Sequence, residues 1–274
     1  MTDATAFHPQ ISFMSANFVA RESGWSIAEW GEGDRAVHAA FSPIETFADR
    51  FGTLLDEALA LGFDTVDLWE AHLSPRWATD EHVAAAVSAL RDRGVRVASL
   101  AGGFGETEAE VDEACRLAVA VGAPILGGRT KLLDTDPRAL ERLLERHDLR
   151  YGLENHPERT PEEVLDQLGR DAGPRIGATV DTGWFGTQGY DAARAIEVLG
   201  ERVVHVHLKD VRHEGTPHET CGYGDGVVPL RECVETLRRM GYTGAISVEH
   251  EPETYDPRPE IKQARKTVAA WVAA

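Results

Sequence analysis

Short runs rich in β-branched and apolar residues alternate with amphipathic helical patterns along the whole chain. The runs are QISFM (10–14), DTVDLW (64–69), VRVASL (95–100), APIL (123–126), RYGLE (150–154), IGATVD (176–181), VVHVHL (203–208) and AISVE (245–249). Several of the helical patterns between them end at a glycine, which is a common helix stop. Strict alternation of this kind indicates parallel strands that are joined by helical crossovers.

The length of the chain helps to choose between the two architectures that such alternation allows. The chain has 274 residues, close to the roughly 250 that are typical of a (β/α)8 barrel. A doubly wound open sheet would carry the phosphate-binding pattern GxGxxG after its first strand, and this chain lacks it there. We therefore predict an α/β fold, a single (β/α)8 TIM barrel domain over residues 1–274. Residues 15–42 are long for a connection from strand to helix, and we expect a loop that forms either a lid or an oligomer contact.

Composition and charge exclude several classes of partner. The formal net charge is −18, which repels the phosphates that a nucleic-acid-binding protein must neutralise. The N-terminal stretch MTDATAFHPQ lacks the pattern of a signal peptide, and no apolar run approaches the roughly 20 residues of a membrane span. The three cysteines form no CxxC pair, which favours a reducing cytoplasm. We expect a cytoplasmic protein that acts on a small molecule, without nucleic acid or membrane as a partner.

Two histidines share one face of a predicted strand. His205 and His207 are two residues apart in VVHVHL, so both side chains point to the same side of an extended chain. In a closed barrel one strand face meets the packed interior and the other meets the helices. An unpaired polar group in either place costs a few kcal/mol. The two histidines therefore need partners.

The last four predicted strands each end in a side chain that can bind metal. These residues are Glu154, Asp181, His207 and Glu249. Active sites of such barrels lie at the carboxyl ends of the strands. Each acid taken alone could cap a helix or lie in a loop, but four together at matching positions would repel one another without a cation. Three carboxylates and one imidazole favour Mn²⁺ or Mg²⁺, with Co²⁺ and Zn²⁺ as alternatives.

Motifs at these strand ends resemble those of the xylose-isomerase-like barrels. The motifs are ENHPE, VDTGW, HVHLKD and VEHEPE, in this order, and the resemblance is closest to bacterial proteins labelled sugar phosphate isomerase/epimerase. It implies that Glu154, Asp181, His207 and Glu249 hold one divalent ion. It also implies that Glu154 and Glu249 carry out the proton chemistry.

The function expected from this resemblance is a metal-dependent sugar isomerase or ketose epimerase. A proton would leave the carbon next to a carbonyl, and the metal would stabilise the resulting enediolate. A dehydratase of a keto-polyol, as in inosose dehydratase, needs the same metal and base and stays open as an alternative. A barrel that has lost catalysis is a more remote alternative. An endonuclease-IV-like phosphodiesterase is disfavoured, because that family has a histidine where this chain has Trp184.

Further residues near the strand ends are candidates for contact with substrate. For each of them we weigh a substrate contact against a structural role in a loop, the barrel rim or the surface; they are His156, Lys209, Trp184, His72 and Arg212. His205 lies one layer deeper than His207, and Asp210 follows Lys209. We expect these two to support the metal ligands rather than to bind the metal. The sequence also leaves a homo-oligomer open.

Overall fold

The computed structural model describes residues 7–169 and 172–274, and its centre is a closed barrel of parallel strands. The strands are β1 (Ile11–Met14), β2 (Thr65–Trp69), β3 (Arg96–Gly103), β4 (Ile125–Arg129), β5 (Arg150–Glu154), β6 (Ile176–Asp181), β7 (Val203–Leu208) and β10 (Ile246–Val248). They follow one another around the barrel in chain order, and β10 closes it by pairing with β1. All eight predicted strands are present, which confirms the predicted TIM barrel.

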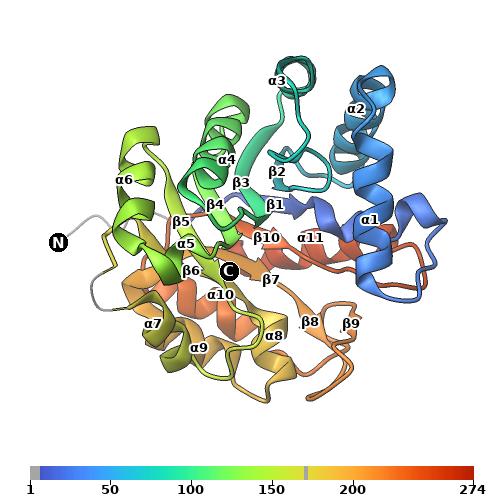
Figure 1. Ribbon diagram of the computed structural model, residues 1–274. Helices are drawn as coiled ribbons and strands as arrows, with labels where there is room; N and C mark the ends of the chain where they lie inside the picture. The colour runs from blue at the N-terminus through green and yellow to red at the C-terminus, as the bar shows by residue number, and fades with distance from the viewer. Residues whose placement is uncertain (1–6, 170–171) are drawn as a thin grey trace.

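Helices surround these strands (Figure 1). They are α1 (Trp30–Phe41), α2 (Ile44–Ala60), α3 (Asp80–Arg93), α4 (Glu108–Val121), α5 (Leu132–Thr135), α6 (Pro137–His147), α7 (Pro161–Leu168), α8 (Thr182–Thr187), α9 (Ala192–Leu199), α10 (Leu230–Arg239) and α11 (Arg258–Ala273). Three short 3-10 turns, at Ser15–Phe18, Arg21–Ser23 and Gly200–Arg202, and the two-stranded hairpin of β8 (Asp210–Val211) and β9 (Thr220–Cys221) complete the fold.

The long segment 15–42 is more ordered than the loop we expected. Two 3-10 turns and the 12-residue helix α1 fill much of it. Gly33, Val37 and Phe41 are four residues apart and form the buried side of α1, a spacing that places side chains on one helix face. A Cβ on Gly33 would lie 2.5 Å from the carbonyl oxygen of Val19, so glycine lets the helix pack closely here. The role of this segment as a lid or an oligomer contact stays a prediction.

The interior of the barrel is unusually polar near the carboxyl ends of the strands. Asp181 pairs with His207 in the register of β6 and β7, and His207 pairs with Ser247 on β10. On the other side of the barrel Asp67 pairs with Ser99. All five of these side chains are buried, whereas barrel interiors are dominated by bulky branched residues. The register therefore brings distant polar residues into one layer.

The described residues also bear on the expectations about membrane and redox environment. Within residues 7–169 and 172–274, no helix has both the length and the apolar character needed to cross a bilayer. Cys115, Cys221 and Cys233 are buried free thiols. The first six residues of the N-terminal stretch that we judged not to be a signal peptide lie outside the described residues.

Candidate metal centre

Three of the four predicted metal ligands converge on one point at the end of the barrel. Nδ1 of His207 lies 2.6 Å from Oε1 of Glu154 and 3.2 Å from Oε2 of Glu249. These three atoms all lie within 4.8 Å of one another. A divalent ion with ligand bonds of about 2.0–2.2 Å fits between atoms at such distances.

The chemistry of these three atoms also fits a cation. Among the described residues, the buried atoms without a hydrogen-bond partner include both ring nitrogens of His207 and Oε2 of Glu249. Burial alone would lower the pKa of His207, but the carboxylates of Glu154 and Glu249 outweigh it and raise that pKa well above its usual value. The site therefore attracts positive charge strongly, and a divalent ion would satisfy the same electrostatic demand.

The fourth predicted ligand, Asp181, is turned toward a lysine. Its Oδ1 accepts hydrogen bonds from the backbone N–H groups of Gly183 and Trp184 and so caps α8. Its Oδ2 accepts a hydrogen bond from Nζ of Lys209 at 3.1 Å. The same nitrogen lies 2.8 Å from Oε1 of Glu249. Asp181 thus meets the converging residues through the ammonium group of Lys209.

Lys209 is held by a third carboxylate that the sequence analysis overlooked. Its Nζ donates to Oε2 of Glu251 at 3.0 Å. Burial alone would lower the pKa of Lys209, but Asp181, Glu249 and Glu251 raise it well above its usual value. An ammonium group has three hydrogen-bond donors, and three carboxylates take them. The structure therefore pairs Lys209 with acidic side chains, and since Lys209 also lines the cavity over the site, its predicted contact with substrate stays a prediction. Glu251 stands two residues after Glu249 in VEHEPE, a spacing that could have drawn attention to it.

Asp67 on β2 is a second residue that the sequence analysis missed. Its Oδ2 accepts a short hydrogen bond from Nε2 of His205 and lies 3.1 Å from Nε2 of His207. Ser99 and Ser247 donate their hydroxyl protons to the same carboxylate. His205 thus contacts Asp67 one layer below the converging residues, and its supporting role stays a prediction. The available signal was an acid in the middle of DTVDLW, on the face opposite to Val66 and Leu68.

Asn155 joins the ends of β5 and β6. Its side-chain nitrogen donates to the carbonyl oxygen of Asp181 at 2.9 Å, and its side-chain oxygen accepts from the backbone N–H of Asp181 at 2.9 Å. The amide therefore takes the place of a peptide group in the ladder, one residue beyond Glu154. These two hydrogen bonds fix the relative positions of Glu154 and Asp181.

Asp210 braces a glycine-rich loop. Its carboxylate accepts backbone hydrogen bonds from Gly224, Gly226 and Val228. The same loop carries Tyr223, whose hydroxyl donates to the carbonyl of Leu208 and accepts from the backbone N–H of Glu249 at 3.3 Å. Asp210 therefore supports Glu249 through the loop, and its predicted supporting role has a structural route.

A cavity of about 1000 Å³ lies over the converging residues. Glu154, His207, Lys209 and Glu249 belong to its lining, as do four aromatic side chains: Trp30, Trp69, Trp184 and Tyr255. His156 also lines it, with Nε2 3.9 Å from Oε2 of Glu154. The cavity combines acidic groups with aromatic faces, a combination that suits a small polyhydroxylated molecule.

One wall of this cavity is a stacked pair of rings. Trp184 stacks on His218, with ring centroids 4.0 Å apart and planes at 10°. Burial lowers the pKa of His218 to about 3, so this ring is neutral. Trp184 and His156 thus keep their predicted place beside the site, and their contact with substrate stays a prediction. His218 comes from a loop far along the chain, and the sequence analysis gave no role to it.

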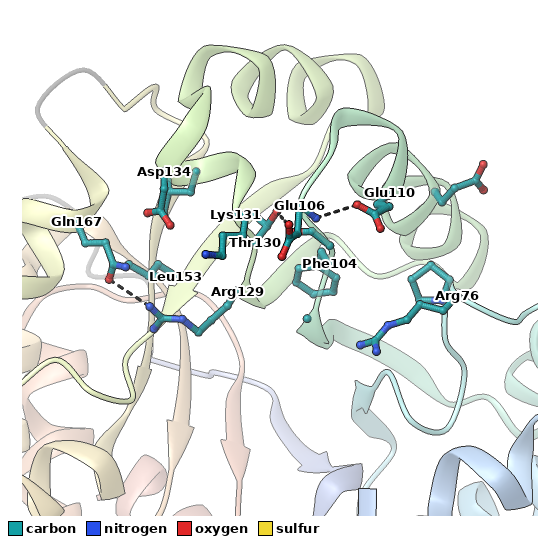
Figure 2. A pocket seen from close by; sticks show the side chains of 15 residues that line it. Arg76, Phe104, Glu106, Glu110, Arg129, Thr130, Lys131, Asp134, Leu153 and Gln167 are labelled. Atoms are coloured by element: carbon teal, nitrogen blue, oxygen red, sulfur yellow. Dashed lines mark hydrogen bonds between the residues drawn. The ribbon is translucent and has the colours of Figure 1, made fainter. Parts of the chain in front are cut away.

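A second cavity, of about 770 Å³, adjoins the first and shares Arg76, Gly103 and Arg129 with it. Figure 2 shows the Arg129 guanidinium turned toward Gln167, while Arg76 enters from the other side of Phe104. Arg129 also donates to the carbonyl oxygen of Glu154 at 2.9 Å and pairs with Glu158 at 3.1 Å. Arg129 thus anchors the backbone of a predicted metal ligand.

Two predicted substrate contacts lie away from both cavities. His72 is completely buried, and its Nδ1 lies 3.1 Å from Oγ of Ser15. Its ring packs edge-on against Phe41 and Trp69, so it belongs to the core beneath the cavity. Arg212 is exposed and pairs with Glu219 at 2.8 Å. The structure does not bring either side chain to the lining of these two cavities, and neither is retained as a candidate substrate contact.

Comparison with known proteins assigns the chain to a family and relates it to several enzymes. Residues 55–272 match the family model described as a xylose isomerase-like TIM barrel. L-ribulose-5-phosphate 3-epimerase UlaE of Escherichia coli is 38% identical over 72 residues, which cover 26% of this chain and 25% of that protein. The aligned segments span less than half of the length of each of the first curated relatives.

Solved structures share the same fold over nearly the whole chain. The IOLI protein, crystallised with a bound zinc atom, has a TM-score of 0.69 and 14% identity, covering 96% of this chain and 98% of its own. The probable 3-DHS dehydratase AsbF of Bacillus anthracis, involved in petrobactin synthesis, has a TM-score of 0.68 and 14% identity, covering 95% and 98%. Identities this low establish a shared fold only.

Proposed function

The chain belongs to the xylose isomerase-like TIM barrel family, and on that premise we propose that it is a divalent-metal-dependent sugar isomerase or ketose epimerase. The observation that carries the proposal is the convergence of Glu154 Oε1 and Glu249 Oε2 on Nδ1 of His207 beside a cavity. Glu154, His207 and Glu249 would hold the ion, and Asp181 would join them where its carboxylate exchanges Lys209 for the metal. Hard oxygen ligands favour Mn²⁺ or Mg²⁺.

The bound ion would act as a Lewis acid that stabilises negative charge on the substrate oxygens. The two glutamates do the proton transfer. They enter from β5 and from the end of β10, on either side of His207, so they can reach a substrate carbon from different directions. One carboxylate takes the proton next to the carbonyl and the other returns a proton. Return to the opposite face of the same carbon inverts it, and return to the neighbouring carbon moves the carbonyl.

The residues around the two glutamates keep their carboxyl groups ionised. Burial alone would raise the pKa of Glu249, but Lys209 and His207 outweigh it and lower that pKa. Burial likewise opposes ionisation of Glu154, while His207 and His156 lower its pKa. Both groups are therefore carboxylates that are ready to bind metal or to accept a proton. Trp184 and Trp69 supply flat apolar walls against which the C–H face of a sugar can pack.

The UlaE relative supports an epimerase through its printed activity, while the fold shared with AsbF keeps a dehydratase as the second candidate. The test is incubation of the Mn²⁺-loaded protein with a panel of ketoses and keto-polyols in D₂O, followed by mass spectrometry and NMR. We expect deuterium at the carbon next to the carbonyl without loss of mass. Loss of one water would identify the dehydratase instead. Absence of exchange and water loss across the panel, together with absence of metal binding, would overturn the enzymatic proposal.

A further inference from the structure

The Asp67 carboxylate is surrounded by four side chains from three other strands, three of which donate hydrogen bonds to it. Oδ1 accepts from the hydroxyl of Ser99 on β3. Oδ2 accepts from the hydroxyl of Ser247 at 2.6 Å and from Nε2 of His205, and it lies 3.1 Å from Nε2 of His207. The carboxylate is completely buried. Ser99, Ser247 and His205 all donate to this carboxylate, so it acts as a hydrogen-bond acceptor toward the side chains around it.

The two edges of the His207 ring therefore meet different environments. Nε2 faces the fully buried Asp67, whereas Nδ1 faces Glu154 and Glu249 at the cavity. A neutral imidazole carries one proton, and the hydrogen-bond partner of one nitrogen decides which nitrogen is left to bind metal. The accepting oxygen of Asp67, 3.1 Å from Nε2, favours a proton on that nitrogen, which leaves the lone pair of Nδ1 directed at the glutamates.

Asp67, His205 and His207 each offer a ligand atom that lies within 4.8 Å of the other two, as the atoms of a second metal site would. The hydrogen bonds of Asp67 disfavour an ion there. Its carboxylate already accepts from the hydroxyls of Ser99 and Ser247 and from Nε2 of His205, so its oxygens have donors as partners. Protons rather than a second ion therefore link these three side chains.

We propose that Asp67 is a positioning residue for the metal centre: it keeps the ring proton of His207 on Nε2 and so presents Nδ1 to the cation. This inference rests on the proposed metal-dependent function of the same site. A residue on β2, across the barrel from the ligands, would thus determine which ring nitrogen of His207 binds the metal. Partners of this kind, which hold the far nitrogen of a metal-binding histidine, are typically worth about 10–100-fold in metal affinity.

The decisive measurement is the protonation of the His207 ring in protein labelled with ¹⁵N-histidine and loaded with diamagnetic Zn²⁺. The His207→Gln variant assigns the signal. We expect Nε2 to carry the proton and Nδ1 to show the shift of a metal-bound nitrogen. A metal-bound Nε2 in the wild-type protein would overturn the inference, and this measurement depends on no variant at Asp67.

Three variants separate positioning from packing. Asp67→Ala removes the acceptor, and we expect Mn²⁺ affinity to fall about 10–100-fold in calorimetry. Asp67→Asn keeps one oxygen that accepts from Nε2, so we expect it to recover part of the affinity. Ser99→Ala removes a contact to Oδ1 only, and we expect an affinity within about threefold of wild type, well below the loss of about 10–100-fold expected for Asp67→Ala. Circular dichroism and thermal unfolding establish that each variant is folded.

The outcomes also separate this inference from the proposed function. Equal metal affinity in wild type and Asp67→Ala, or an equal loss in Ser99→Ala and Asp67→Ala, would overturn the role of Asp67 and leave the enzymatic proposal standing. A protein that binds metal through Nδ1 with the expected order of affinities, but exchanges no substrate proton and releases no water, would overturn the enzymatic proposal and leave the role of Asp67 standing.

Discussion

Nζ of Lys209 lies 2.8 Å from Oε1 of Glu249, the carboxylate whose other oxygen faces His207. The lysine is buried, and its neighbours Asp181 and Glu251 are acids as well. A single positive charge thus offsets much of the repulsion among side chains from β6 and from the end of β10. The stability of the metal-free protein should therefore depend on Lys209.

We predict that Lys209→Met destabilises the metal-free protein by about 3–5 kcal/mol, because it leaves buried carboxylates without a partner. Urea unfolding with and without Mn²⁺ measures the effect. Added Mn²⁺ should restore more stability to the variant than to wild type, since the ion replaces the missing charge. Exposed Lys131 provides the control, and Lys131→Met should stay within about 0.5 kcal/mol of wild type. A variant of Lys209 as stable as wild type in EDTA would contradict this account.

The proton-transfer roles of Glu154 and Glu249 should be separable from any role in folding. We predict that Glu154→Gln and Glu249→Gln each slow exchange of the substrate α-proton by about 10²–10⁴-fold, because an amide cannot accept that proton. Exchange in D₂O, followed by NMR, measures the rate at saturating metal. Glu158→Gln is the matched control, since Glu158 pairs with Arg129 instead, and it should retain most of the rate. Full exchange in both glutamine variants would rule out their proton-transfer roles.

Asp210 should contribute to stability through the loop that it braces. We predict that Asp210→Asn costs about 1–3 kcal/mol, because the amide nitrogen cannot accept from the backbone N–H groups of Gly224 and Gly226. Chemical denaturation gives the value. Asp225 lies in the same loop with an exposed side chain, and Asp225→Asn should be neutral. Equal effects of the two substitutions would mean that the loop contacts are unimportant.

His72 should make stability depend on pH. Burial, with smaller contributions from Arg21 and His38, lowers its pKa well below the usual 6.5. Below pH 6.5 His72 takes up a proton in the unfolded chain but stays neutral in the folded protein. Its contribution to the free energy of unfolding is therefore fully present above pH 6.5 and is lost as the pH decreases. The slope from this residue is at most about 1.4 kcal/mol per pH unit.

We therefore predict that His72→Asn flattens the dependence of unfolding free energy on pH between about 6.5 and 5, the range in which only the unfolded histidine titrates. Denaturation at several pH values measures this slope. Replacement of exposed His8 by Asn should leave the slope unchanged. A steep slope that persists in His72→Asn would assign the dependence to other buried histidines such as His218 and His250.

The barrel was predictable because its signal is local. Each strand is a short apolar run, and the helical patterns between them repeat in order, so all eight strands were located. The ends of β5, β6, β7 and β10 could be read in the same way, because a strand end and its last polar residue are adjacent in sequence. The helical character of 15–42 was missed because the whole segment was treated as one connection from strand to helix, although Gly33, Val37 and Phe41 follow a helical spacing within it.

The contacts between strands were not predictable. Asp67 and His205 are 138 residues apart, and their meeting depends on barrel closure and register rather than on spacing. The three carboxylates around Lys209 likewise come from separate parts of the chain. His72 follows a strand end, as a substrate contact would, yet the packing of Phe41 and Trp69 carries it into the core. Parity along a strand gives the direction of a side chain and leaves its partner undetermined.

The paired bonds between Asn155 and the backbone of Asp181 have a consequence for how such a protein can diversify. They hold the ends of β5 and β6, which carry Glu154 and Asp181, at a fixed separation. Residues farther along the loops after β5 and β6 can then change, and reshape the mouth of the cavity, without moving these strand ends. Substitutions in those loops can thus change which molecules enter the cavity while Glu154 and Asp181 keep their relative positions.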